Sequence, residues 1–353
     1  MSTDHAVTPM PRSPSRPPGP SRARDGRSLR RRLARPEVAA AAGAVAVWIL
    51  FALSAGPAFR SGAGLAAVLN AAAPLGILAA PVALLMIAGE FDLSVGSTIG
   101  AAGMALLLLT GQFGWPLGPA IVAALALAAL VGLLNGWLVV RTRLPSFLVT
   151  LGTMYVVRGL TIGLARMLTG RTQLSGLEGT PGFDATRFIL GGDLGPIGVA
   201  VLWWLAVALV CEYVLRRTPF GNWTFAAGGA PAAAREAGVP VARVKVVLFV
   251  ATSLAAALVA ILQAARYGGA DALRGEGQEF RAIVAAVIGG TLLAGGYGSA
   301  IGAALGALVF GMVQQGIVIT GIDADWFQVV LGALLVAAVL FNDWVRRRAE
   351  AGP

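Results

Sequence analysis

The sequence predicts an all-α polytopic membrane protein with about ten transmembrane helices. Hydrophobic residues make up 57% of the 353 residues, and charged residues make up only 12%. A soluble domain typically has about 25% charged residues. The apolar residues gather in runs that approach the roughly 20 residues needed to cross a bilayer. Glycine-rich stretches separate several runs, as in the broken helices of transporters. These three observations exclude a soluble globular protein.

Ten apolar runs account for the predicted spans. The two shortest are well below the length that a perpendicular helix requires, and they lie next to glycine-rich breaks, so tilted, re-entrant or broken helices are expected there. The number of spans is therefore nine to eleven. The runs are 38–53, 67–88, 98–110, 117–140, 147–164, 197–215, 246–265, 283–293, 300–320 and 327–341.

The first 37 residues are rich in proline, serine and arginine and show no apolar periodicity. This composition is typical of disorder, so we expect a basic tail at 1–37, a membrane domain at 38–345 and a short tail at 346–353. With the first tail inside, 19 of the 27 basic residues fall on the cytoplasmic side. This bias has the sign of the positive-inside rule, and it predicts that both termini are cytoplasmic.

Several functions are excluded by composition. The only cysteine, Cys211, lies in an apolar run, and the only histidine, His5, lies in the tail. No metal site, disulfide framework or histidine-based catalysis can be built from them. The sequence also lacks a phosphate-binding loop and a basic stripe for nucleic acid. We therefore expect no catalytic residue, no metal and no cofactor on this chain.

The segment 89–97 is the most unusual break between apolar runs. It places Glu90, Asp92 and Ser94 beside membrane-length apolar sequence. A charge near the bilayer centre costs from about 3 to more than 10 kcal/mol, so these groups are expected at a boundary, a helix end or a wet cavity. Two interpretations remain open. The segment is either a cytosolic turn that caps the next helix, or part of a transport path.

An internal echo relates the two halves of the chain. Asn135-Gly136 followed by 147–152 resembles Gln315-Gly316 followed by 327–332, at one constant spacing. This spacing covers five predicted helices, which is what an inverted repeat produces. Small residues such as Gly100, Gly103, Gly302 and Gly306 are expected to allow close helix packing.

The longest internal hydrophilic segment is 216–245. Within it, Ala232 to Pro240 is predicted to form a short helix, with Gly238 at its end and Pro240 blocking its continuation. Such a short helix is not stable alone and must pack against something. It is either an ordinary surface connector or a docking element for another protein.

Four blocks of this sequence resemble the permease subunits of ribose/xylose-type ABC importers, in order and over about residues 60–345. The first block is 89–96, which is similar to a Gly-Gly-x-Asp-Leu-Ser-Val-Gly signature. The others are Asn135-Gly136 with 144–154 and 158–159, then 218–222 with 227–229 and 237–239, then 279–283 with 285–291 and 295–299.

This resemblance implies a type II-like importer fold with about ten helices per subunit and two subunits around the path, as a homodimer or with a paralogue. It also implies a cytoplasmic ATPase that holds ATP and Mg²⁺, an extracytoplasmic sugar-binding protein near loops 167–196 and 267–281, and a bacterial inner membrane. The short helix becomes the coupling helix to the ATPase, with Ala233, Arg235, Glu236, Ala237, Gly238 and Val239. Candidate path or gate residues are Glu90, Asp92, Ser94, Asn135, Phe147, Thr150 and Glu279.

Two departures from the family pattern affect polar positions, because Glu90 replaces a glycine and Arg281 stands where an acidic residue is common. Import of a monosaccharide or related polyol is the function that the resemblance implies. Two alternatives remain, an ion-coupled secondary transporter that uses Glu90 and Asp92, and an ABC permease for branched-chain amino acids.

Overall fold

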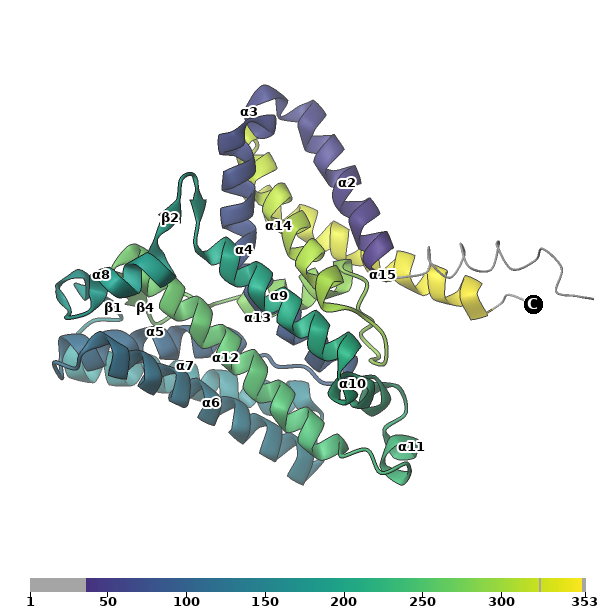
Figure 1. Ribbon diagram of the computed structural model, residues 1–353, viewed down its shortest axis with the longest axis horizontal. Helices are drawn as coiled ribbons and strands as arrows, with labels where there is room; N and C mark the ends of the chain where they lie inside the picture. Colours follow the sequence, from purple (N-terminus) through teal and green to yellow (C-terminus); the bar gives the residue numbers. More distant parts are fainter. Residues whose placement is uncertain (1–35, 324, 351–353) are drawn as a thin grey trace, which may run out of the picture.

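The computed structural model describes residues 36–323 and 325–350, and most of these are helical (Figure 1). The prediction of an all-α polytopic membrane protein is confirmed, because each predicted span contains one apolar helix. These helices are α2 (Pro36–Ser54), α4 (Gly62–Ile87), α5 (Val95–Gly111), α6 (Leu117–Thr142), α7 (Ser146–Thr169), α9 (Ala200–Arg217), α12 (Val241–Tyr267), α13 (Gln278–Ile288), α14 (Ala300–Thr320) and α15 (Trp326–Glu350).

Six of the described helices are long and apolar enough to cross a membrane, and α5 and the apolar part of α15 are shorter. The central helix is α4, since 78% of its apolar stretch is buried, whereas only 11% of the stretch in α7 is buried. The α7 helix therefore lies at the edge of the molecule, with an apolar surface that suits lipid or a second membrane subunit.

The second half of the chain repeats the first. Helices α12, α13, α14 and α15 follow α4, α5, α6 and α7 in the same order, at a spacing of about 180 residues. The packing repeats as well. Helix α4 packs most extensively on α14, which is the equivalent of α6, and α12, the equivalent of α4, packs most extensively on α6 itself. The α4 and α12 helices are antiparallel, since Glu90 after α4 pairs with Lys245 near the start of α12. The helices therefore form the inverted repeat that the sequence predicts.

Glycines allow the closest helix contacts, as predicted. A Cβ at Gly100 would overlap the carbonyl of Ala272, and one at Gly302 would overlap the carbonyl of Gly289. At Gly306 the neighbour is the carbonyl of Ala285. Gly100 thus brings α5 against the loop after α12, and Gly302 and Gly306 bring α14 against α13. Side chains of ordinary size would prevent these backbone-to-backbone contacts.

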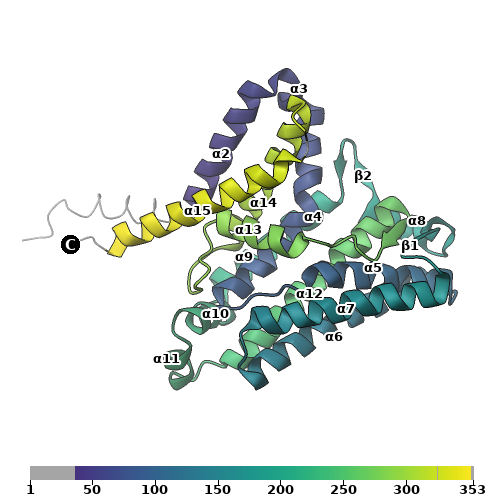
Figure 2. The same cartoon turned by 180° about the vertical axis from the view of Figure 1, so that it is seen from behind.

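A small irregular cap covers the end of the molecule away from α11 (Pro231–Glu236), as both ribbon views show (Figures 1 and 2). It contains η1 (Leu177–Gly179), α8 (Phe183–Thr186), η2 (Arg187–Gly191) and the hairpin of β2 (Asp193–Leu194) with β3 (Ile197–Gly198). Strand β1 (Gln173–Ser175) pairs antiparallel with β4 (Gly269–Asp271). This pairing joins the loop after α7 to the loop after α12.

The structure changes some predicted boundaries. The span 283–293 is wrong at its end, because α13 stops at Ile288. Gly290 has a φ of +87°, and the N–H of Thr291 bonds the carbonyl of Ala286 at 3.0 Å, which closes the helix. The segment 216–245 also contains α10 (Pro219–Gly229), in addition to the expected short helix. Helix α15 continues to Glu350, into the segment expected to be a tail.

The predicted disordered tail lies almost wholly outside the described residues. Only Pro36 and Glu37 of that segment are described, and both belong to α2.

Candidate functional site

The break between α4 and α5 contains a buried cluster of polar groups. It begins where Gly89, with a φ of +81°, ends α4. The N–H of Gly89 bonds the carbonyl of Met86 at 2.9 Å, and the N–H of Glu90 bonds that of Leu85 at 3.1 Å. Gly89 can adopt this left-handed conformation because it has no Cβ. The chain then runs without helix to Val95, and this brings Asp92 and Ser94 into the interior.

Asp92 is only 1% exposed, and both oxygens of its carboxylate accept hydrogen bonds. One oxygen accepts hydrogen bonds from the backbone N–H of Ser94 at 2.9 Å and from its hydroxyl at 2.6 Å. The other oxygen accepts from the hydroxyl of Thr252 on α12 at 2.9 Å. Asp92 therefore fixes the turn before α5 and ties it to α12. This satisfies the polar groups that burial would otherwise penalise.

Two further helices hold the same break from the other side. The side-chain amide of Asn135 on α6 donates to the hydroxyl of Ser94 at 2.8 Å. On α7, the hydroxyl of Thr150 accepts from the N–H of Leu93 at 3.0 Å, and the hydroxyl of Ser146 accepts from the N–H of Phe91 at 2.9 Å. Backbone groups without partners in the helix ladder are thus bonded by side chains.

Glu90 forms an ion pair with Lys245, the only lysine of the chain. The two side chains are 10% and 18% exposed, so the pair is mostly buried. Lys245 lies in the second turn of α12, close to the end of the hydrophilic segment. Of the predicted path residues, Glu90, Asp92, Ser94, Asn135 and Thr150 come together in this cluster.

The other two predicted residues lie elsewhere. Phe147 is 48% exposed at the start of α7 and does not enter the cluster. Glu279, in the first turn of α13, is 2% exposed, and its Oε2 has no hydrogen-bond partner among the described residues. That oxygen lies against Gly96, where a Cβ would collide with it.

The short helix expected from Ala232 to Pro240 is α11, which begins at Pro231 and already ends at Glu236. Its end is closed by Gly238, whose φ is +82°, and by a 2.9 Å bond from the N–H of Val239 to the carbonyl of Ala234. Ala234 is buried, whereas Ala233, Arg235, Glu236 and Ala237 are exposed. Figures 1 and 2 show α11 at one extremity of the molecule. One face is therefore anchored and the other is free to bind a partner.

Sequence reasoning missed several residues of this region. Lys245 and Thr252 lie on α12, far along the chain from the carboxylates that they contact, and no local signal marks them. Glu212 of α9 was missed as well. Its carboxylate accepts from the N–H groups of Ala300 and Ile301 at 2.9 and 3.2 Å, and it thereby caps α14.

Comparison with known proteins finds permease components of transport systems, both as a family and as individual relatives. The profile of the family described as "Branched-chain amino acid transport system / permease component" matches residues 64–339. The chain is 33% identical over 304 residues to the fructose import permease protein of Rhizobium meliloti. The aligned region covers 85% of this chain and 83% of the relative. No solved structure gave a significant match.

Two other relatives have similar sequence identity and coverage. The chain is 35% identical over 290 residues to the autoinducer 2 import system permease protein of Escherichia coli O9:H4 (strain HS), with 78% of this chain and 86% of the relative covered. It is 31% identical over 271 residues to the ribose import permease protein of Escherichia coli K12, with 76% and 81% covered.

Proposed function

This chain belongs to the family of transport-system permease components, and from that membership we propose that it forms the membrane path of an ABC importer for a monosaccharide or a related polyol. The observation that carries this proposal is the similarity to fructose, ribose and autoinducer 2 import permeases across more than three quarters of the chain. The segment from Asp92 to Gly96, which points to the sugar branch of the family, folds into the buried cluster.

An importer for branched-chain amino acids is the less favoured alternative. The family description names these solutes, but the relatives named for fructose and ribose match this chain over 85% and 76% of its length. An amino acid also carries two opposite charges that a binding region must match. In the buried cluster, the charged side chains Glu90 and Lys245 already neutralise each other.

The ATPase is expected to bind at α11. A helix of six residues is too short to be stable alone, and here it is anchored only through one buried face. Its exposed side chains, Arg235 and Glu236, would contact a cleft of the ATPase. Closure of the ATPase would then move α12, because α11 leads directly into that helix. With α11 on the cytoplasmic side of a bacterial inner membrane, both termini also face the cytoplasm.

The extracytoplasmic sugar-binding protein is expected at the opposite end. Strands β1 and β4 join the two loops that the sequence assigns to this contact, so one continuous surface is available. A second permease subunit, either an identical copy or a paralogue, would pack beside α7 and complete the path. ATP and Mg²⁺ would be held by the ATPase alone.

The experiment is transport by the complete importer in proteoliposomes. We expect ATP-dependent uptake of labelled ribose or fructose when this chain, its ATPase and its binding protein are all present. Glu236→Ala combined with Gly238→Trp should abolish both uptake and the stimulation of ATP hydrolysis by the binding protein. Gly114→Trp is the matched control, since Gly114 also has a positive φ and open surroundings but lies in the α5–α6 loop. Unchanged coupling in the double variant would contradict the docking role of α11.

An ion-coupled transporter is tested in the same system. It predicts that this chain alone accumulates sugar on a proton or sodium gradient, and that an uncoupler abolishes the uptake. The structure does not favour it, because Glu90 is paired with a lysine and both oxygens of Asp92 accept hydrogen bonds from neighbouring residues. We expect no uptake without the ATPase.

A further inference from the structure

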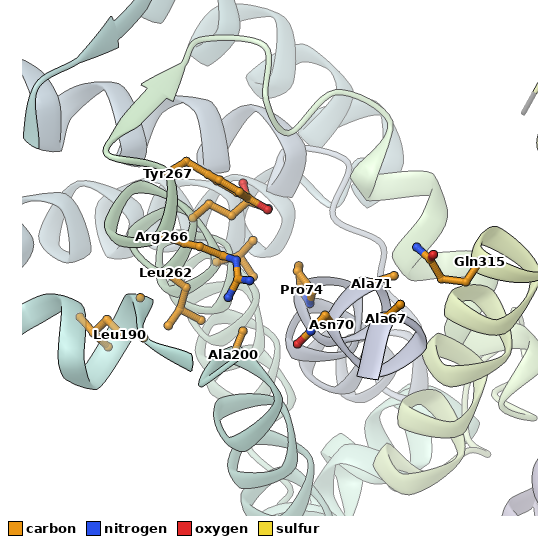
Figure 3. Close-up of a pocket in the computed structure, with 14 residues that line it drawn as sticks. Ala67, Asn70, Ala71, Pro74, Leu190, Ala200, Leu262, Arg266, Tyr267 and Gln315 are labelled. Atoms are coloured by element: carbon orange, nitrogen blue, oxygen red, sulfur yellow. The ribbon is translucent and has the colours of Figure 1, made fainter. Parts of the chain in front are cut away.

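A second polar region, separate from the α4–α5 break, surrounds a cleft of about 320 Å³ between α4, α12, α14 and the cap (Figure 3). Asn70 and Pro74 come from α4, Gln263, Arg266 and Tyr267 from the end of α12, and Gln315 from α14. Figure 3 shows side chains from these three helices around a common space. Polar side chains inside a membrane domain are costly unless they face each other or water, so their convergence indicates a wet site.

Some of these polar groups position the site and others are free to bind. Asn70 is held by the cap, because its amide donates to the carbonyl of Pro196 at 3.0 Å and its oxygen accepts from the N–H of Gly198 at 2.7 Å. Gln263 differs, since its Oε1 is buried without a hydrogen-bond partner among the described residues. Gln315 and Tyr267 likewise make no side-chain hydrogen bond within the part of the chain that the structure describes.

The backbone adds an acceptor. Pro74 lies inside α4 and has no N–H to give to the carbonyl of Asn70, four residues earlier. That carbonyl therefore lacks its usual helix partner at the level of the cleft. The cleft thus combines amide donors and acceptors, a phenol hydroxyl and a carbonyl without its usual helix partner.

The charge of the cleft is balanced. The guanidinium of Arg266 forms an ion pair with Asp193 at 2.6 Å, and no other charged side chain among the described residues lines the cleft. A phosphate or carboxylate ligand would compete with Asp193 for this guanidinium. A neutral solute with several hydroxyl groups would match the two free carboxamides, which both donate and accept.

We propose that this cleft is a binding site for a neutral polyol at the outer end of the transport path. The cleft lies at the end of α12 opposite α11, next to the loops joined by β1 and β4, where a solute would arrive. Its volume is at the lower end of the range of about 300–1,000 Å³ for small-molecule sites, which suits a monosaccharide. This inference rests on the proposed function and names residues of this chain that contact the solute, chiefly Gln263 and Gln315.

Transport by the complete importer tests the proposal. Gln263→Leu and Gln315→Leu should each lower the initial rate of ribose or fructose uptake by about three- to tenfold, the effect of one lost hydrogen bond. Stimulation of ATP hydrolysis by the binding protein should stay within about twofold of the wild type, because α11 is untouched. Gln314→Leu is the matched control, since Gln314 is the exposed neighbour of Gln315 outside the cleft, and it should transport normally.

The outcomes separate this inference from the proposed function. If the wild-type importer takes up neither sugar nor any other polyol, the proposed function fails and the cleft has no role in it. If the wild type transports and both leucine variants transport at the same rate, the inference alone is overturned.

Cysteine labelling provides a measurement that does not depend on the solute. With Cys211→Ser as background, Gln315→Cys should react with a membrane-impermeant methanethiosulfonate added from outside, and uptake should stop. Gln314→Cys should retain uptake under the same treatment. A Gln315→Cys chain that assembles with its ATPase but does not react would also overturn the inference.

Discussion

The carboxylate of Glu90 and the ammonium of Lys245 form a mostly buried ion pair that joins the α4–α5 break to the beginning of α12. The pair links a position where the family pattern has glycine to the only lysine of the chain. Since α12 follows α11 directly, this contact lies between the expected docking helix and the buried cluster around Asp92.

We predict that Lys245→Met destabilises the protein, because it leaves Glu90 buried without its partner. The free energy of unfolding should fall by about 3 kcal/mol. The combined variant Glu90→Gln and Lys245→Met should recover most of this loss, since no charge is left unpaired. Thermal unfolding of the importer in detergent measures both. A single variant as stable as the wild type would show that the pair is solvated.

Asp92→Asn tests whether Asp92 holds the structure or contacts the solute. An amide has only one oxygen, so it cannot accept hydrogen bonds from both Ser94 and Thr252 as the two carboxylate oxygens do. The free energy of unfolding should fall by about 1–3 kcal/mol. Thr252→Val, which removes only one of these bonds, should cost less. A KM that rises while the unfolding temperature stays unchanged would instead place Asp92 in the path.

Gly302→Ala should be strongly destabilising, because the added methyl group overlaps the carbonyl of Gly289. Overpacking of this kind costs about 1–3 kcal/mol. Gly152→Ala on α7 is the control, as nothing lies within 4 Å of the added Cβ. The unfolding temperature should therefore fall for Gly302→Ala. It should rise for Gly152→Ala, since alanine favours helix by about 1 kcal/mol over glycine.

Glu212→Gln should weaken the start of α14. The carboxylate accepts from two N–H groups there and also bonds the guanidinium of Arg216 at 2.7 Å. A charged cap at a helix N-terminus contributes up to about 2 kcal/mol when partly buried. Glu276→Gln is the comparison, because its pair with Arg158 is exposed on the glutamate side and should contribute less than about 1 kcal/mol. Equal effects on the unfolding temperature would contradict this ranking.

The ten apolar helices were predictable because each coincides with an apolar run, and the repeat was predictable because Asn135 and Gln315 stand at equivalent positions. The end of α13 was not predictable from the sequence. Apolar composition continues to Leu293, and only the backbone conformation of Gly290 ends the helix. Composition reports burial, but it does not report where a chain turns.

The site was predictable in part. The sequence singled out Glu90 and Asp92 as costly, but their partners Lys245 and Thr252 lie more than 150 residues away along the chain. Such pairs depend on how the two halves interlock, which no local pattern contains. The outer cleft was missed for the same reason, since Gln263 and Gln315 lie in separate apolar runs and no local pattern shows that the fold brings them together.

The antiparallel packing of α4 and α12 has a mechanical consequence. A relative tilt that spreads the ends carrying Asn70 and Gln263 draws together the ends carrying Glu90 and Lys245, and the reverse tilt does the opposite. In the proposed transport path, one rigid rocking movement of α4 against α12 would therefore open one end while it closes the other.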